Sequence, residues 1–168
     1  MSEYSHIKRE FGPVYDKNSK LLILGSFPSV RSREAKFYYG HPQNRFWRVL
    51  ARVLECEMPA DVPGKKSVLL KNGVALWDTI EECDIVGSSD SSIKNVVPVD
   101  ILRVLNAAHI RNIYCNGATS FSLFMKYLYP ISGITPIKLP STSPANAAWT
   151  EERLFGEWIK IRNDLEKI

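Results

Sequence analysis

The sequence predicts an α/β fold, a three-layer α/β/α sandwich with a central four-stranded parallel sheet. Three observations lead to this prediction. Short apolar runs alternate along the chain with segments of helical periodicity, as in β-α-β units. The runs are apolar throughout, as expected of parallel strands that are covered on both faces. No internal repeat or linker-like change of composition divides the chain, so residues 1–168 are expected to form a single domain.

Four apolar runs are the expected strands. The first follows a polar, mixed segment, residues 1–20, which is interpreted as an N-terminal arm or a short preliminary element. Each run leads into residues that can turn the chain, such as Gly25-Ser26 or Asn116-Gly117. The strands are expected at Leu21–Leu24, Val74–Trp77, Ile113–Cys115 and Ile137–Leu139.

Apolar residues at helical spacing lie between and after these strands. The pair Asn72-Gly73 is a plausible helix end, and Asp100 is expected to cap the helix that follows it. Pro130 is expected to stop a later helix. The helical stripes run from Trp47 to Leu54, Val68 to Leu70, Ile101 to Ala108, Phe121 to Leu128 and Phe155 to Leu165.

The net charge of +4 and the pI of about 9.0 permit a polyanionic partner without requiring one. Positive charge is concentrated between residues 31 and 52, where Glu34 is the only acid. A solvated basic face would show the same pattern, so the alternative stays open. The basic residues of this segment are Arg31, Arg33, Lys36, Arg45, Arg48 and Arg52.

The three cysteines, Cys56, Cys83 and Cys115, are odd in number and contain no C-x-x-C pair, which indicates reduced intracellular thiols. The sequence contains no N-terminal hydrophobic leader, transmembrane-length apolar segment or lipidation signal. A cytoplasmic protein, with no membrane partner, is therefore expected.

The carboxyl ends of parallel strands lie at one edge of a sheet, which is where open α/β sheets bind their ligands. Four segments are therefore expected to converge on one site: Gly25–Pro28, Asp78-Thr79, Asn116-Gly117 and Ser141–Pro144. The sequence lacks a Walker A motif, G-x-G-x-x-G, G-x-S-x-G and H-E-x-x-H, so it gives no direct support to nucleotide hydrolysis, dinucleotide binding, serine hydrolysis or zinc proteolysis.

Two polar features near this site have alternative interpretations. His41 precedes a proline in a loop, and a structural hydrogen bond is favoured over catalysis; with only three histidines, no metal site is expected. The hydroxyl-rich segment Gly87–Ser92 could bind phosphate or satisfy turns.

Three motifs carry a resemblance to the uracil-DNA glycosylase superfamily. They are Gly25–Pro28 (G-S-F-P), Tyr39–Trp47 (Y-G-H-P-Q-N-R-F-W) and Ser141–Pro144 (S-T-S-P). The H-P-x-N-R-F-W string is the specific one and resembles the mismatch-specific uracil/thymine branch, and the whole pattern is most similar to the hypoxanthine (deoxyinosine) DNA glycosylase branch. The resemblance extends from Leu21 to Trp158, most of the chain.

The resemblance implies a monofunctional DNA glycosylase of base-excision repair that flips a deaminated base out of DNA and acts without metal or cofactor. Tyr39 matches the family position whose ring stacks on the flipped base. Asp78 lies where related enzymes read the base edge, with the N–H groups of Ser26 and Phe27 left to serve a base oxygen; a turn or N-cap aspartate is the alternative. The expected substrate-binding residues are Gly25, Ser26, Phe27, Pro28, Tyr39, Asp78, Asn116 and Gly117.

The chain departs from the family pattern at two positions. Phe27 stands where related uracil enzymes have the Asp or Asn that positions the attacking water, and Leu139 or Ser141 stands where a late His or Asn is usual. Asn44 is the expected catalytic substitute, because its amide oxygen can orient a water without deprotonating it. Asn44 could equally be only the N-cap of the helix that follows.

The expected activity is excision of hypoxanthine first and uracil second, an order that comes from the resemblance alone. A non-catalytic nucleic-acid-binding protein on the same fold and a small-molecule nucleoside hydrolase are the alternatives. The partner implied is DNA containing deaminated bases, bound by a monomer. The expected DNA-binding residues are Arg31, Arg45, Ser141, Thr142, Ser143, Pro144 and Asn146.

Overall fold

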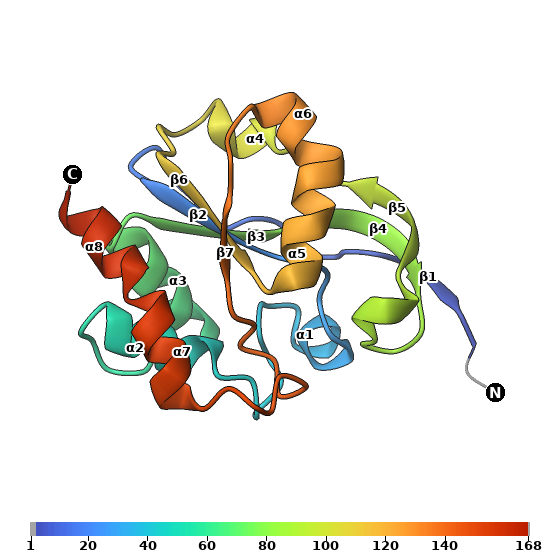
Figure 1. The fold of residues 1–168 in the computed structure, drawn as a ribbon, viewed down its shortest axis with the longest axis horizontal. Helices are drawn as coiled ribbons and strands as arrows, with labels where there is room; N and C mark the ends of the chain where they lie inside the picture. Colours follow the sequence, from blue (N-terminus) through green and yellow to red (C-terminus); the bar gives the residue numbers. More distant parts are fainter. Residues whose placement is uncertain (1–2, 168) are drawn as a thin grey trace.

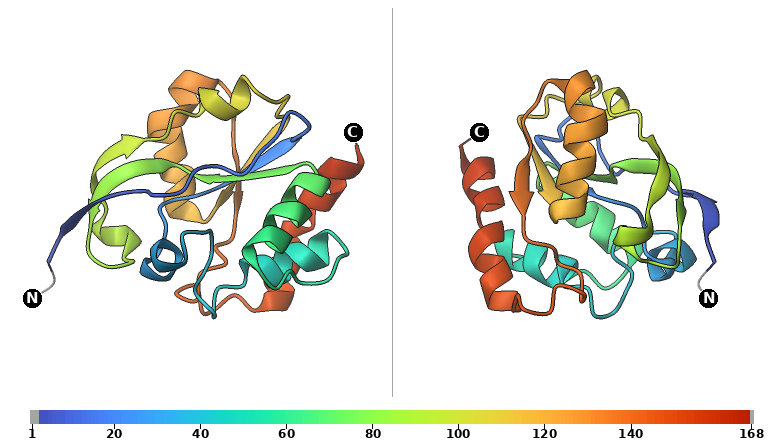
Figure 2. Two further views of the ribbon diagram at one scale, coloured as in Figure 1. Left: turned by 180° about the vertical axis from the view of Figure 1, so that it is seen from behind. Right: turned by 45° about the vertical axis from the view of Figure 1, so that its right-hand side comes forward.

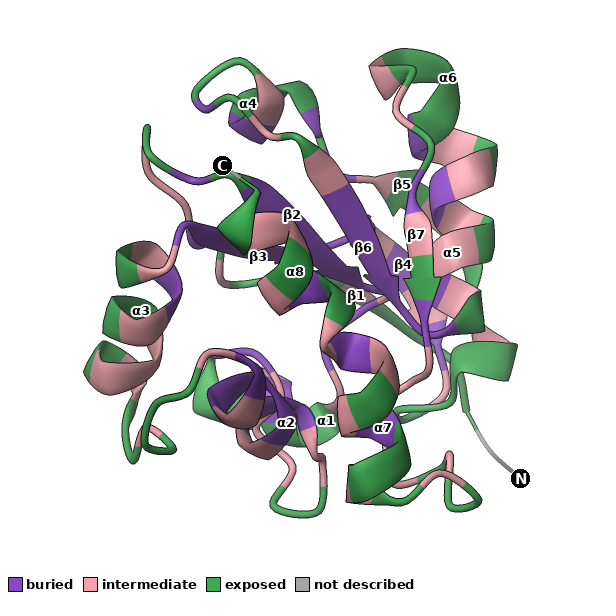
Figure 3. Ribbon diagram, turned by 60° about the vertical axis from the view of Figure 1, so that its left-hand side comes forward, coloured by how far each residue is buried: buried purple, intermediate pink, exposed green. Residues whose placement is uncertain are grey.

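The expected parallel sheet is present in the computed structural model, which describes residues 3–167. Its strand order is β3-β2-β6-β7, and all of its pairings are parallel. Every residue of β2 and β3 is buried, which agrees with the apolar runs Leu21–Leu24 and Val74–Trp77 (Figure 3). The strands are β2 (Leu21–Gly25), β3 (Val74–Asp78), β6 (Asn112–Asn116) and β7 (Ile137–Leu139).

Helices cover both faces of this sheet, so the three-layer α/β/α arrangement is confirmed (Figure 1). One face carries α2, α3, α7 and α8, and the other carries α4, α5 and α6. The helices are α1 (Val30–Ala35), α2 (Phe46–Val53), α3 (Val62–Lys71), α4 (Leu102–Leu105), α5 (Ala118–Leu123), α6 (Tyr129–Ser132), α7 (Glu151–Trp158) and α8 (Lys160–Glu166).

A second, antiparallel sheet was not predicted from the sequence. Its order is β1-β4-β5, from β1 (Ser5–Lys8), β4 (Ile80–Ile85) and β5 (Lys94–Pro98). Only Thr79 separates β3 from β4, so the chain passes directly from one sheet into the other (Figure 2). These strands contain charged and polar residues and are partly exposed, so they lack the uniform apolar runs that mark the parallel strands.

Two expected helix boundaries are wrong. The side chain of Asp100 does not cap α4; its backbone carbonyl accepts a hydrogen bond from the N–H of Arg103 instead. Pro130 does not stop the helix that contains Phe121, because a π-helical turn, Phe124–Leu128, precedes it and Pro130 then lies in the first turn of α6, where a missing N–H is tolerated. Gly133, with φ 67°, ends this helical segment.

The antiparallel sheet has its own small core, formed by Phe27, Ile80, Cys83 and Ile85. The Phe27 side chain thereby connects the turn after β2 to the second sheet. All three cysteines are free, as expected, and Cys83 and Cys115 are buried. Within the described residues, no helix combines the length and hydropathy needed to cross a membrane.

Candidate active site

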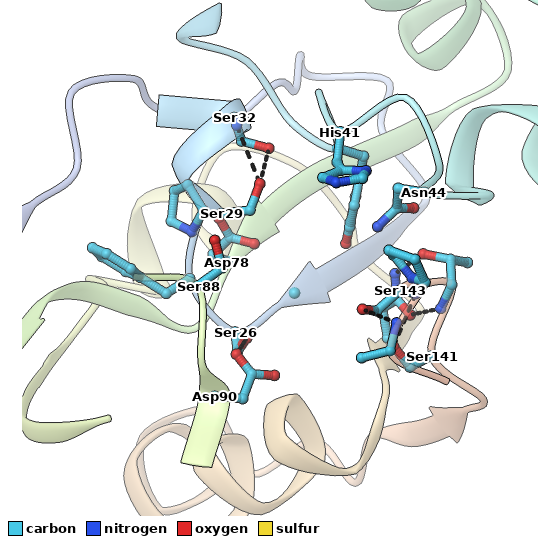
Figure 4. Close-up of a pocket in the computed structure, with 18 of the residues that line it drawn as sticks. Ser26, Ser29, Ser32, His41, Asn44, Asp78, Ser88, Asp90, Ser141 and Ser143 are labelled. Atoms are coloured by element: carbon cyan, nitrogen blue, oxygen red, sulfur yellow. Dashed lines mark hydrogen bonds between the residues drawn. The ribbon is translucent and has the colours of Figure 1, made fainter. Parts of the chain in front are cut away.

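A cavity of about 590 Å³ lies at the carboxyl ends of the parallel strands, and we call it the strand-end cavity (Figure 4). The volume is in the range of small-molecule and cofactor sites. Four strand ends or the loops after them contribute to its wall, as expected for an open α/β sheet. The lining residues are Gly25–Ser29, Ser32, Tyr38, Tyr39, His41, Asn44, Asp78, Ser88–Ser91, Asn116 and Ser141–Ala145.

Most of the expected site residues therefore lie together, but four do not line the strand-end cavity. The N–H of Gly117 donates to the O atom of Leu139, the last residue of β7, at 2.9 Å, and Gly117 does not line the cavity. Asn146 lines a neighbouring groove of about 540 Å³. Arg31 and Arg45 lie outside both.

Leu139 and Ser141, the two candidates for the position of the late His or Asn, lie in different surroundings. Ser141 lines the strand-end cavity, whereas Leu139 is fully buried as the last residue of β7.

Gly25 lies against two functional groups at the floor of this cavity. A Cβ atom at this position would be 2.4 Å from Asp78 Oδ1 and 2.9 Å from the Tyr39 hydroxyl oxygen. These distances are shorter than any normal contact, so only glycine allows the carboxylate and the phenol to approach the end of β2. The sequence signal for this close approach is the glycine that ends the first apolar run.

Asp78 forms a buried ion pair with Arg9, which was not predicted from the sequence. Arg9 Nη1 lies 3.1 Å from Asp78 Oδ2, and the two side chains are 2% and 5% exposed. Burial raises the pKa of the Asp78 carboxyl, and the positive charge of Arg9 acts in the opposite direction. Arg9 lies in the polar N-terminal segment, where nothing in the sequence distinguishes it from a surface arginine.

Three further N–H groups of Arg9 are also used. Its Nε donates to Phe11 O at 2.9 Å, Nη1 donates to Ile80 O at 3.1 Å, and Nη2 donates to the Tyr38 hydroxyl at 3.1 Å. The Tyr38 hydroxyl in turn donates to Gly12 O at 2.7 Å. This network holds the guanidinium in one orientation beneath the strand-end cavity.

The ring of Tyr39 is held by stacking on Phe46. The ring centroids are 4.0 Å apart with planes 19° apart, and Phe46 is fully buried. Tyr39 adopts φ 54°, an unusual conformation for a residue other than glycine. Its buried hydroxyl has no hydrogen-bond partner within residues 3–167, and burial raises its pKa, so it stays a donor.

Asn44 lies one residue before Arg45, the N-cap of α2, and also lines the cavity. Its Oδ1 accepts from the backbone N–H of Phe46 at 2.9 Å, at the start of α2. One lone pair of the amide oxygen and the amide NH₂ group remain for other partners. The N-cap interpretation of Asn44 is therefore wrong, and its contact with the Phe46 N–H is compatible with the catalytic interpretation.

The late loop, Ser141–Asn146, is held in place by the protein itself. The Asn116 side chain donates to Thr142 Oγ1 at 3.0 Å and accepts from Thr142 N at 3.1 Å. The Arg45 guanidinium donates to carbonyl oxygens of the loop and of the segment after it. Those acceptors are Thr142 O, Ser143 O, Asn146 O and Trp149 O.

The turn after β2 contains two backbone amides, those of Ser26 and Phe27, that are not used in the described part of the fold. Within the part of the chain that the structure describes, no hydrogen bond is donated by the backbone N–H of Ser26 or of Phe27. The carbonyl of Ser26, in contrast, accepts from Ile80 N at 3.1 Å. Both amides thus lack an acceptor among the described residues, and both residues line the cavity.

Asp90 is a second carboxylate of the strand-end cavity and was not singled out in the sequence. It begins a 3₁₀ turn, Asp90–Ser92, in the loop between β4 and β5. Its Oδ1 accepts from Ser26 Oγ at 3.1 Å, so the two segments are joined at the cavity wall (Figure 4). Burial raises the pKa of Asp90, and the charge of Asp78 adds to the effect. The only sequence signal was the hydroxyl-rich composition around it.

This site has the components needed to bind a flat heterocycle: a cavity, a backed aromatic ring, a carboxylate and unpaired amides. Within residues 3–167, no group of three or more His, Cys, Asp or Glu side chains is arranged to hold a metal ion. The fold and the site together define an α/β protein with a cavity at the carboxyl ends of its parallel strands, lined by a backed aromatic ring and a carboxylate.

The family model described as Uracil DNA glycosylase superfamily matches residues 13–165, so the chain belongs to this superfamily of DNA glycosylases. A protein of Methanosarcina acetivorans named "Hypoxanthine DNA glycosylase" is 32% identical over 156 residues, covering 92% of this chain and 98% of its own length. A protein of Methanosarcina barkeri with the same name is 33% identical over 116 residues, covering 67% and 73%. A solution NMR structure of a Methanosarcina acetivorans protein matches with a TM-score of 0.81 and 32% identity, over 95% and 98% of the two chains.

Proposed function

We propose that this protein is a monofunctional DNA glycosylase that hydrolyses the N-glycosidic bond of deaminated bases, hypoxanthine first and uracil second. The proposal rests on one observation above all: the Asp78 carboxylate and the Tyr39 ring meet against Gly25 at the floor of the strand-end cavity. The ranking of the two bases is supported by the names of the two Methanosarcina relatives.

The base edge would be read by Asp78 and by the backbone of the turn after β2. Hypoxanthine and uracil each carry a ring N–H next to a carbonyl oxygen. The Asp78 carboxylate can accept from that N–H, and the amide of Ser26 or Phe27 can donate to the carbonyl oxygen. Adenine and cytosine, the bases from which they arise, present a ring acceptor at the same place, and this acceptor would be repelled by the carboxylate.

The base face would be bound by Tyr39. Stacking of a base on an aromatic ring is worth about 1–3 kcal/mol and tolerates different bases. Because Phe46 backs the Tyr39 ring, the stacking surface is rigid before the base arrives.

Asn44 would orient the attacking water at the deoxyribose. An amide oxygen is too weak a base to deprotonate water, so this role suits a dissociative reaction in which the leaving base carries away the electron pair. The bound base anion would be stabilised by the turn amides, which act as donors where negative charge develops.

DNA would be held at the mouth of the cavity. Ser88, Ser89 and Ser91 on one side and Ser141 and Ser143 on the other carry hydroxyl groups that can bind phosphates. Arg31 is exposed on α1 and makes no ion pair among the described residues, so its charge is available to a phosphate.

The proposal is tested with duplexes that contain one deoxyinosine, one deoxyuridine or only normal bases, followed by alkaline cleavage of abasic sites. We expect strand breaks only after alkali, and faster with deoxyinosine than with deoxyuridine. DNA binding without excision would favour the non-catalytic binder. Release of hypoxanthine from free inosine, with no excision from DNA, would favour the nucleoside hydrolase.

A further inference from the structure

The strand-end cavity contains two carboxylates in different electrostatic states. Asp78 and Asp90 are the only acidic residues among those that line it. Asp78 is neutralised by Arg9 at 3.1 Å. Asp90 takes part in no ion pair within residues 3–167; its side-chain partners are the neutral hydroxyls of Ser26, at 3.1 Å, and Thr119. One negative charge in the cavity is therefore uncompensated.

The position of Asp90 is determined by the turn after β2. Ser26 Oγ donates to Asp90 Oδ1 at 3.1 Å, and Ser26 directly follows the glycine at the cavity floor. Asp90 lies beside Ser26, on the side of the cavity opposite Asn44 (Figure 4). Asp90 is one of the exposed residues of the cavity wall, so a base seated on the floor between it and Asn44 would place its deoxyribose toward the open side of the cavity, on the side of Asp90.

In the proposed reaction, positive charge develops on the deoxyribose, and a nearby negative charge would stabilise it. The C1′–N bond breaks and its electron pair leaves with the base, which leaves the sugar ring electron-poor. A water oxygen then bonds to C1′, the surplus proton of this water passes to solvent, and the released base takes up a proton. An anion near C1′ lowers the energy of the electron-poor sugar, and it does so most strongly where water is excluded.

No other described side chain that lines the cavity supplies an uncompensated negative charge. Phe27 is apolar and packs into the core of the second sheet. Asn44 is neutral, and the charge of Asp78 is balanced by Arg9. Resting on the proposed function, we propose that Asp90 is a catalytic residue whose carboxylate faces the deoxyribose and stabilises its developing positive charge, with Ser26 as its positioning residue.

The test is single-turnover excision by Asp90→Asn. The amide oxygen of Asn can still accept from Ser26 Oγ, so the contact is retained while the charge is lost. We expect the rate constant for excision to fall roughly 10²–10³-fold, the range seen when one electrostatic stabiliser is removed. The fall should be similar for deoxyinosine and deoxyuridine, because the sugar is common to both, and affinity for DNA with an abasic product should not weaken.

Two matched variants separate charge from structure. Asp84→Asn removes the same charge from β4, where Asp84 contacts His6 and Asn95 away from the cavity, and it should leave the rate within about twofold of the parent. Ser26→Ala keeps the Asp90 charge and removes the contact, and it should slow excision by less than Asp90→Asn. A thermal melt verifies folding, and Asp90→Ser replaces Asp90→Asn if the latter does not fold.

Three results would overturn the role of Asp90. The first is parental excision rate in Asp90→Asn, the second is a loss confined to one of the two bases, and the third is a loss in Ser26→Ala as large as that in Asp90→Asn. A parent protein that excises neither base overturns the proposed function itself, so the two failures are distinguishable.

Discussion

Arg9 and Asp78, 69 residues apart in the chain, form a buried ion pair that joins β3, at the floor of the strand-end cavity, to the segment after β1. The pair places a charged side chain from the N-terminal segment under the group proposed to read the base. Its geometry, together with that of the residues around it, leads to five predictions.

Loss of Arg9 should destabilise the fold strongly. Arg9→Met leaves the Asp78 carboxylate buried without a counter-charge, and breaking a buried pair on one side costs about 3–5 kcal/mol. Urea unfolding measures this. Lys36→Met, which breaks an exposed pair with Glu10 at 3.7 Å, is the control and should cost about 0–1 kcal/mol. Equal effects of the two variants would contradict the prediction.

Gly25→Ala should abolish excision. The added methyl group would occupy the space of Asp78 Oδ1 and of the Tyr39 hydroxyl, so both groups must move from the cavity floor. Gly156→Ala in α7 is the control, because its Cβ meets nothing within 4 Å; it should stabilise the protein by about 0.5–1 kcal/mol and leave excision unchanged. Excision by Gly25→Ala at the parental rate would refute the assignment of the cavity floor.

Two substitutions of Asn44 should separate its hydrogen bond with the Phe46 N–H from its proposed catalytic role. Asn44→Ser keeps an oxygen that can accept from Phe46 N–H, whereas Asn44→Ala does not, so only Asn44→Ala should lose about 1 kcal/mol of stability. Both should slow single-turnover excision by at least about tenfold. Full activity of Asn44→Ala would remove Asn44 from the mechanism and leave the rest of the site intact.

Asp90→Asn should make the protein more stable at neutral pH. A carboxyl whose pKa is raised on folding favours the folded state while protonated, and this contribution is lost as pH rises through the raised pKa. Urea unfolding should therefore show a gain for Asp90→Asn near neutral pH, and the gain should vanish below the usual pKa of an aspartate.

Asp84→Asn should change the stability at neutral pH in the opposite direction. Hydrogen bonds from Asn95 and His6 lower the pKa of Asp84, so its contribution to stability is present at neutral pH and lost as pH falls. Asp84→Asn should thus be destabilised near neutral pH. A loss of stability at neutral pH in both variants would show that folding does not raise the pKa of Asp90.

Arg31 and Arg45 should differ in their effects on DNA binding. Arg31 is exposed and makes no described ion pair, so Arg31→Gln should lower the slope of log K against log salt by about 1. Arg45→Gln should leave the slope unchanged and cost about 1.5–3 kcal/mol of stability, because its guanidinium binds the late loop. A reduced slope in Arg45→Gln would show that Arg45 also contacts phosphates.

The parallel sheet could be predicted because its strands are buried on both faces, which requires uniformly apolar runs such as Leu21–Leu24. The antiparallel sheet could not, because partly exposed strands such as Lys94–Pro98 carry polar residues that resemble loops. Tyr39 and Asn44 were found through a local string that carries a family resemblance, and Asp78 was found through its position at the end of the second predicted strand. Arg9 and Asp90 belong to no such string.

The sequence by itself determined the layers of the fold, the edge of the sheet at which the site lies and the family of the protein. The layers and the edge follow from local patterns of apolar and turn-forming residues, and the family follows from the motif strings that resemble it. Only the tertiary structure decided the charges in the strand-end cavity, because Arg9 and Asp90 reach it from segments far from the motifs. Electrostatic interactions depend on distance in space and on burial, and neither can be read from separation along the chain.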